Sequence, residues 1–300
     1  MPVADVEVVV QSTAELGEGP LWDPTASQLF WLDAEAGLIN RYSPSSGAVS
    51  SLHTDSAIAC LALGPPGKLI VASRQEVRCI DVTTGLATSL FKPGLPSGYM
   101  FNDGRCDPYG RLVIGTAADP FVADDVAMGA EPDQGQIYRL DKHGQPSVLW
   151  RGLQVSNGIG WSPDGRTIYF TDSGHHRIYA ANYPPEGPLH DPQTFAEDAP
   201  DIAPDGLCVD ADGGIWSAKW NAGCVVRYDP AGRIDTRVLL PVPQPSSLAF
   251  GGADLDVLFI TTARIWLEPM DVARHPLSGS LLAIRPGFRG LPERTVRIPA

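Results

Sequence analysis

A polar residue recurs at one place in a unit that repeats along the whole chain. In the four clear copies it stands five positions before a turn and precedes a short apolar run, in the frames EGPLWDP, NDGRCDP, NGIGWSPDG and DGLCVDADG. These residues are Glu18, Asn102, Asn157 and Asp205. Two weaker copies place Ala59 and Ser246 at the same offset. Units of short strands that recur roughly every 40 to 55 residues have the length of propeller blades. The sequence therefore predicts an all-β fold, a six-bladed β-propeller.

The fourth copy shows how one blade is built. IGWSP is a short apolar strand, DG a tight turn, TIYFTDS an alternating strand, and RIYAANYP a third strand. Short alternating runs separated by DG are typical of β-hairpins. The chain also has 31 glycines and 28 prolines, which interrupt it too often for long helices. We therefore expect four-stranded blades, with strands A to D following one another from the innermost strand outward.

The first strand-like segment, VEVVVQ at residues 6–11, precedes the first blade and needs a partner. A propeller must protect its strand edges, and a strand from one terminus can complete the blade at the other terminus. We expect this segment to join the sixth blade, so that N- and C-terminal strands close the fold. A repeat over the whole chain also predicts a single domain at residues 1–300.

Composition excludes several classes of partner. Of the 300 residues, 43% are hydrophobic and 19% charged, enough for a sizeable core. The net charge of −13 disfavours nucleic acid and anionic lipid as partners. No apolar run approaches the roughly 18 residues that a membrane span needs. We expect a soluble cytoplasmic protein, a monomer or small homo-oligomer, without nucleic-acid or membrane partners.

The cysteines are read as buried hydrophobic residues. Their number is odd, and no pair has the CxxC spacing of a zinc or redox motif. Free cysteines in apolar runs pack as small hydrophobes. They are Cys60, Cys79, Cys106, Cys208 and Cys224.

The recurring oxygen donors predict a metal site. Equivalent positions of a radially repeating fold lie on a ring, so the four side chains are expected to converge. Two carboxylates and two amide oxygens suit Ca²⁺, Mg²⁺ or Mn²⁺. The alternative is structural, because Asn, Asp and Glu also bind free backbone groups where loops meet strands.

The connections between strands B and C are expected to surround this ring. Two of them are long, at residues 117–134 and 263–279, and long loops in compact domains often bind ligands or cover a site. His175 lies in the same connection of the fourth blade and Trp220 in that of the fifth. His175 is a candidate for substrate contact. The alternative is that it is an exposed polar side chain without a functional contact. Trp220 is a candidate wall of the pocket, and the alternative is that it packs between blades.

Five segments together resemble the SMP-30/gluconolactonase/regucalcin family of six-bladed propellers. They follow one another from about residue 16 to residue 284: LGEGPLWDP, FNDGRCDPYGRLVIGT, VSNGIGWSPDGRTIYFTDS, IAPDGLCVDADGGIWSAKW and TTARIWLEPMDVARHPLSGSLLAI. The resemblance implies a divalent-metal-dependent hydrolase that opens a sugar lactone to the hydroxy acid. It also implies one bound metal ion, with Ca, Mn, Zn, Mg or Fe(II) as candidates, and a small-molecule lactone as partner.

Carried over residue by residue, the resemblance makes Glu18, Asn157 and Asp205 the metal ligands. Asn102 matches a position that contacts substrate or water beside the metal. Many relatives have a sugar-binding arginine where Met100 stands here. A second substrate-contacting carboxylate would fall at Pro120, with Asp119 beside it. The residues that match the metal ligands are thus all present, while those that match the sugar-binding positions differ from many relatives. The identity of the lactone is therefore left open.

For hydrolysis, Asp205 is the candidate general base, because a carboxylate can hold a metal with one oxygen and water with the other. An alternative, in which Asp205 is a ligand only and the metal activates the water, stays open. Two rival functions also remain. One is a phosphotriesterase-type hydrolase on the same oxygens, and the other is a non-catalytic calcium-binding propeller.

Overall fold

The computed structural model describes residues 5–96, 98–120, 133–141 and 143–298. Its strands form six antiparallel sheets of four strands each, the blades of an all-β six-bladed propeller. The chain divides into two compact units, Met1–Ile58 with Asp198–Glu293, and Ala59–Glu197 with Arg294–Ala300. Each unit holds three sheets. The prediction of one domain at residues 1–300 stays a prediction.

The first unit contains the sheets at the two ends of the chain and one sheet from its later half. One sheet is β2 (Gly17–Asp23), β3 (Gln28–Asp33), β4 (Leu38–Ser43) and β5 (Ala48–His53). Another is β18 (Ala203–Val209), β19 (Ile215–Trp220), β20 (Cys224–Tyr228) and β21 (Ile234–Leu239). The last is β22 (Pro245–Gly251), β23 (Val257–Thr262), β24 (Leu281–Ile284) and β1 (Glu7–Val10).

The second unit contains the three sheets from the middle of the chain. The first is β6 (Ile58–Leu63), β7 (Lys68–Ser73), β8 (Val77–Asp81) and β9 (Ala87–Phe91). The next is β10 (Tyr99–Cys106), β11 (Leu112–Ala118), β12 (Gly135–Leu140) and β13 (Pro146–Leu153). The third is β14 (Ser156–Trp161), β15 (Thr167–Asp172), β16 (Arg177–Asn182) and β17 (Gln193–Glu197). The predicted order of strands A to D within a blade is confirmed.

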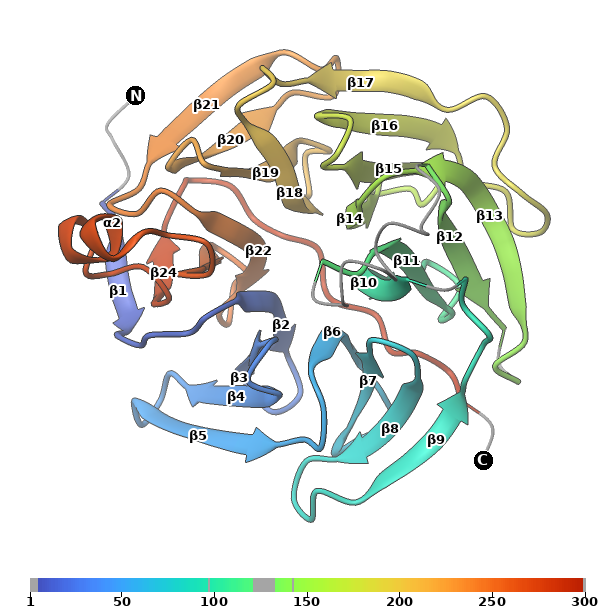
Figure 1. The fold of residues 1–300 in the computed structure, drawn as a ribbon, viewed down its shortest axis with the longest axis horizontal. Helices are drawn as coiled ribbons and strands as arrows, with labels where there is room; N and C mark the ends of the chain where they lie inside the picture. Colours follow the sequence, from blue (N-terminus) through green and yellow to red (C-terminus); the bar gives the residue numbers. More distant parts are fainter. Residues whose placement is uncertain (1–4, 97, 121–132, 142, 299–300) are drawn as a thin grey trace. The chain divides into compact units, whose positions relative to one another are not determined.

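The expected pairing of the terminal strands is also confirmed. β1 pairs antiparallel with β24, with Glu7 opposite Ala283 and Val8 opposite Leu282. Figure 1 shows these two strands, blue and red, side by side. Val9 of β1 packs against a buried cluster that includes Trp22. The first strand therefore covers the edge that β24 would otherwise expose.

The long connection between β23 and β24 contains a short helix, α2 (Pro269–Arg274), that the sequence did not predict. Pro269 begins it and Asp271 lies in its first turn, where a carboxylate opposes the helix dipole. The helix buries no residue. Six residues are too few for hydrophobic periodicity to reveal a helix. In the described residues, no helix is long and apolar enough to cross a membrane.

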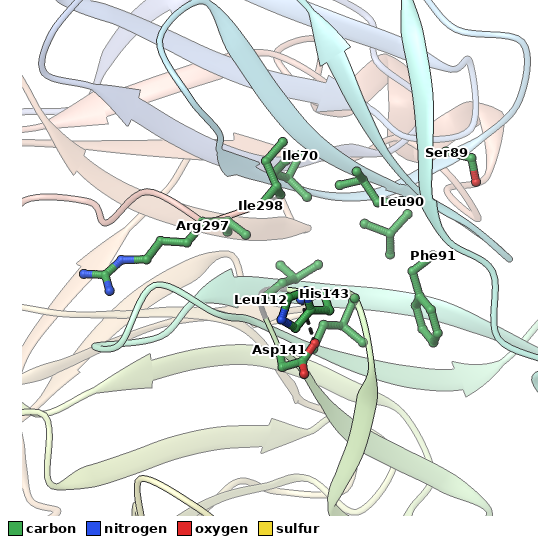
Figure 2. Close-up of a pocket in the computed structure, with 13 residues that line it drawn as sticks. Ile70, Ser89, Leu90, Phe91, Leu112, Asp141, His143, Arg297 and Ile298 are labelled. Carbon is green, nitrogen blue, oxygen red and sulfur yellow. Dashed lines mark hydrogen bonds between the residues drawn. The ribbon is translucent and has the colours of Figure 1, made fainter. Parts of the chain in front are cut away.

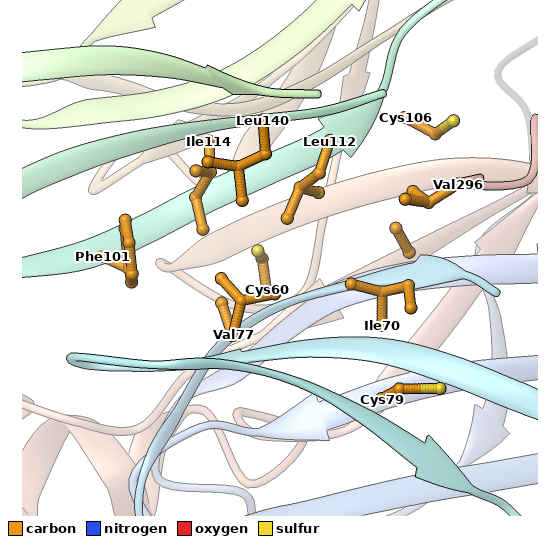
Figure 3. Close-up of a cluster of buried hydrophobic side chains, with 12 residues drawn as sticks. Cys60, Ile70, Val77, Cys79, Phe101, Cys106, Leu112, Ile114, Leu140 and Val296 are labelled. Carbon is orange, nitrogen blue, oxygen red and sulfur yellow. The ribbon is translucent and has the colours of Figure 1, made fainter. Parts of the chain in front are cut away.

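The buried side chains between neighbouring sheets include the cysteines. In the second unit, Cys60, Cys79 and Cys106 pack with Phe101, Ile114 and other apolar residues, as Figure 3 shows. All five cysteines are free and buried. The prediction that they act as small hydrophobes is confirmed.

The predicted turns are stabilised by their own aspartates. In the turn after β10, Oδ1 of Asp107 accepts hydrogen bonds from the backbone N–H groups of Tyr109 and Arg111, both at 2.8 Å. After β18, Oδ1 of Asp210 accepts from Gly214 N at 2.8 Å. These carboxylates accept hydrogen bonds from backbone N–H groups that the turn would otherwise leave unpaired. They differ in role from the oxygens five positions earlier.

Candidate functional site

A β-bulge interrupts the inner strand at the recurring polar position. In each pairing of β2, β10, β14, β18 and β22 with its neighbour, the register shifts across one short step. The shifts run from Glu18 to Leu21, Phe101 to Gly104, Ser156 to Ile159, Pro204 to Leu207 and Pro245 to Leu248. A bulge releases residues from the regular ladder and re-aims their side chains, and bulges are frequent beside active sites. The recurring donors are thus set at specialised backbone positions.

In the first unit, β22 lies between the strands that carry the two carboxylates. A Cβ atom on Gly206 would lie 2.2 Å from Oγ of Ser247, so only glycine allows β18 to approach β22 this closely. On the other side, Ser246 Oγ donates a hydrogen bond to the carbonyl of Gly17. Asp205 precedes Gly206 and Glu18 follows Gly17. The structure therefore brings Asp205 and Glu18 to the two flanks of the β22 bulge.

In the second unit, the two amide side chains are neighbours. Nδ2 of Asn102 donates to the carbonyl oxygen of Ser156 at 2.9 Å, and Ser156 directly precedes Asn157. Nδ2 of Asn157 donates to Oγ of Ser173 at 3.1 Å. Both amide nitrogens are thus committed to the protein. The amide oxygens take no part in these two bonds, and an amide oxygen is an acceptor that can also ligate a cation.

The chemistry of these donors fits a divalent cation that prefers oxygen. Glu18 is half-buried, and its Oε2 accepts from Gly19 N at 3.1 Å. Asp205 is buried, with 6% of its surface exposed. Within the described residues, no group of three or more His, Cys, Asp or Glu could hold a metal ion. The predicted set has a different composition, since it combines two carboxylates with amide oxygens.

His175 is positioned by a buried carboxylate. Its Nδ1 lies 2.7 Å from Oδ2 of Asp172, and its Nε2 lies 3.4 Å from Oδ1 of Asp133. Asp172 also accepts from the backbone N–H groups of Gln154 and Val155 at 3.2 and 3.1 Å. His175 lies in the β15–β16 connection that also carries Ser173, the partner of Asn157. The expected B-to-C location of His175 is therefore confirmed.

Trp220 belongs to a pair of indole rings in the first unit. Its ring meets that of Trp266 edge to face, with 6.0 Å between centroids. Trp220 pairs across the sheet with Ala203, two residues before Asp205. Trp266 is 66% exposed and has a positive φ of 63°, which is unusual for a non-glycine residue. Trp220 therefore has a partner in the long β23–β24 connection.

The strand that ends at Trp220 also carries a buried lysine. Nζ of Lys219 lies 2.6 Å from Oδ2 of Asp198, and the lysine side chain is 2% exposed. Burial lowers the pKa of the Lys219 amine, while Asp198 acts in the opposite direction. Removing Asp198 alone would leave a buried charge without its nearest counter-ion.

Met100 and Asp119 lie at the same end of the β10–β11 pair. Met100 is half-buried and stands opposite Ala117, while the N–H of Asp119 donates to Gly98 O at 2.8 Å. Oδ2 of Asp119 lies 3.6 Å from Nη1 of Arg74. Sequence reasoning missed Arg74, although it belongs to the β7–β8 connection, the second sheet's equivalent of the His175 connection. The sequence also suggests Phe121 and Met128, in the long 117–134 connection, as contacts that cover the site, and both fall outside the described residues.

A cavity of about 250 Å³ lies elsewhere in the second unit. Figure 2 shows its apolar lining, which includes Ile70, Leu90 and Leu112, with Asp141 and His143 at one side. Leu112 begins β11, whereas Ala117, the partner of Met100, lies near its end. The cavity is therefore at the opposite end of this sheet from Asn102 and does not contain the predicted site residues.

Six four-stranded sheets, with register shifts along five inner strands and an Asn, Asp or Glu beside four of them, define a class of β-propeller with a candidate cation site. The chain belongs to the SMP-30/gluconolactonase/LRE-like family, whose model matches residues 16–264. A 6-deoxy-6-sulfogluconolactonase of Pseudomonas putida is 33% identical to it, over 96% of this chain and 97% of the relative. A pentonolactonase of Haloferax volcanii is 34% identical, over 85% of this chain and 84% of the relative.

A solved structure supports the same assignment. The calcium-binding protein regucalcin of Agrobacterium tumefaciens superposes with a TM-score of 0.88 at 28% sequence identity. The match covers 99% of this chain and 97% of the regucalcin chain. The family resemblance and the propeller fold expected from sequence are confirmed.

Proposed function

We propose that this protein is a divalent-metal-dependent lactonase that opens a sugar lactone to the corresponding hydroxy acid. The observation that carries the proposal is the placement of oxygen donors at or directly before the bulges of four inner strands, β2, β10, β14 and β18. Membership of the family and similarity to a sulfogluconolactonase and a pentonolactonase support the reaction type. Asn102, Asn157 and Asp205 are each the first residue of a bulge, and Glu18 is the last paired residue before one.

The proposed metal ligands are Glu18, Asn157 and Asp205. Two carboxylates balance the charge of a divalent ion, and the orientation of the Asn157 amide supports ligation through its carbonyl oxygen. A divalent ion held by them would polarise the lactone carbonyl and lower the pKa of a nearby water. Regucalcin is named a calcium-binding protein, and we propose a divalent ion of the same hard type here.

The proposed general base is Asp205. Its carboxylate would accept a proton from the water whose oxygen attacks the carbonyl carbon. Collapse of the tetrahedral adduct breaks the bond between the carbonyl carbon and the ring oxygen. The proton then passes to that departing oxygen, which becomes the hydroxyl of the product. Asn102 would orient the water or a substrate oxygen, since its amide nitrogen is fixed on Ser156.

The remaining proposed contacts bind the substrate. Trp220, supported by Trp266, offers an aromatic face to a sugar ring. His175 offers a ring nitrogen whose orientation Asp172 fixes. Met100 adds apolar surface, and Asp119 adds a carboxylate. Together these residues suit a small lactone with both hydroxyl groups and apolar ring faces.

A pH-drop assay on the metal-loaded protein tests the proposal. Five- and six-membered lactones, hydroxylated and unsubstituted, should release acid faster than in the presence of a chelator. Faster cleavage of organophosphate triesters than of any lactone would favour the phosphotriesterase alternative. Saturable metal binding without turnover of either class would favour a non-catalytic calcium-binding propeller.

A further inference from the structure

Arg74 is fixed against the start of β10 by two hydrogen bonds between sheets. The N–H of Phe101 donates to the carbonyl oxygen of Arg74 at 2.8 Å. Nε2 of the adjacent Gln75 donates to the carbonyl oxygen of Tyr99 at 2.6 Å. These bonds hold both chain neighbours of Met100 to the β7–β8 connection. The backbone of Arg74 therefore lies beside the segment that leads into Asn102.

The Arg74 side chain is paired with a buried carboxylate at this same place. Its Nη1 lies 3.6 Å from Oδ2 of Asp119, and the two side chains are 27% and 6% exposed. The bond from Asp119 N to Gly98 O fixes the carboxylate relative to β10. A guanidinium presents its N–H donors in a planar fork that matches pairs of neighbouring oxygen atoms. The pair thus combines a donor that solvent reaches with an acceptor held in the protein.

The methionine between Tyr99 and Phe101 provides no hydrogen-bond donor. We propose that the Arg74–Asp119 pair recognises the hydroxyl groups of the lactone and so determines specificity for hydroxylated over unsubstituted rings. A sugar hydroxyl both donates and accepts, and adjacent hydroxyls match an arginine donor beside a carboxylate acceptor. The inference rests on the proposed lactonase function. It assigns hydroxyl recognition to a connection from the neighbouring sheet.

Arg78 offers a matched control. Its Nη2 lies 2.8 Å from Oε2 of Glu76, and its side chain is 26% exposed, close to the value for Arg74. It therefore resembles Arg74 in burial and in having a carboxylate partner. Arg78 lies on β8, away from the two bonds that hold the connection to β10. Replacing it removes a similar charge without removing the proposed contact.

The test compares D-glucono-1,5-lactone with δ-valerolactone, an unsubstituted lactone of the same ring size. Arg74→Ala should raise KM for the hydroxylated lactone about tenfold or more and change that for δ-valerolactone less than twofold. Arg78→Ala should leave both KM values within twofold of the natural protein, and thermal melting should show both variants folded. Equal effects of Arg74→Ala on the two lactones, or equal selectivity loss in the Arg78→Ala control, would overturn the inference.

A binding measurement separates this inference from the proposed reaction. 1,5-Anhydro-D-glucitol has the ring and hydroxyls of the first lactone but no carbonyl to hydrolyse. Arg74→Ala should weaken its calorimetric Kd about tenfold, and Arg78→Ala should not. If no lactone is hydrolysed by the natural protein, the lactonase proposal fails while this result still decides the role of Arg74. Unchanged binding in Arg74→Ala would remove Arg74 from hydroxyl recognition.

Discussion

His175 and Asp172 form a hydrogen-bonded pair, 2.7 Å between Nδ1 and Oδ2, at the end of a buried strand. The first sheet has the same carboxylate without the histidine. There Asp33 accepts from the N–H groups of Glu15 and Leu16, both at 3.3 Å. The aspartate therefore satisfies the backbone N–H groups of this connection by itself, and the fold does not require the histidine.

His175→Ala should therefore leave stability within about 0.5 kcal/mol of the natural protein. It should lower kcat/KM on the preferred lactone about fivefold or more, because a substrate hydrogen bond is lost. Asp172→Ala should instead cost about 1–3 kcal/mol, since the N–H groups of Gln154 and Val155 lose their acceptor. Urea unfolding and steady-state kinetics distinguish the two effects. Unchanged kinetics in His175→Ala would show that His175 does not contact the substrate.

Removing the metal and replacing a proposed metal ligand should both reduce the stability that metal binding gives to the fold. With Ca²⁺ or Mn²⁺ at about 100 times Kd, binding should stabilise the natural protein by about 2.7 kcal/mol. Glu18→Gln and Asp205→Asn should each reduce this gain, whereas Glu7→Gln, at an exposed position on β1, should not. Thermal melting with and without a chelator measures the difference. Full metal-induced stabilisation in both ligand variants would contradict the ligand set.

Excess metal should also separate ligand from base. Asn157→Ala should recover part of its turnover as metal concentration rises, because only occupancy is impaired. Asp205→Asn should stay inactive when the site is filled, because the amide cannot accept the proton from water. Equal recovery of both variants would remove Asp205 from the role of base.

The terminal strand predicts a position-specific effect on stability. Val9→Asp places a carboxylate in the cluster around Trp22 and should cost about 2–4 kcal/mol. The adjacent Val8 is 38% exposed, so Val8→Asp should change stability by about 0.5 kcal/mol. Chemical denaturation of the two variants is the comparison, and equal losses would contradict the register of β1 on β24.

The buried cysteines should not react with thiol reagents while the protein is folded. Burial raises the pKa of Cys60, Cys79 and Cys224, so little thiolate is present at pH 8 in the folded protein. An aromatic disulfide reagent should titrate no thiol in the native state and five after unfolding in guanidinium. Rapid labelling of the native protein would show that at least one of these thiols reaches solvent.

The sequence predicted those features that depend on local pattern. Alternating strands, tight turns and the spacing of the oxygen donors can all be recognised within one repeat, and β1 could be assigned from the need to cover an edge. The bulges could not, because a bulge is a property of two paired strands. The contact of Arg74 with Asp119 joins different sheets, and no local pattern encodes that distance. The short helix α2 has too few residues to show a period.

The pairing of β1 with β24 also constrains when the protein can finish folding. Ser12 and Ser280 bond to each other across 268 residues, so this sheet joins segments that are synthesised far apart in time. The three sheets of the second unit come from one nearly continuous stretch and can form while synthesis continues. The first unit must wait until β24 has been synthesised and has left the ribosome. Translation that stops before β24 would leave β1 and β23 without their shared partner, and such fragments would be targets for aggregation or degradation.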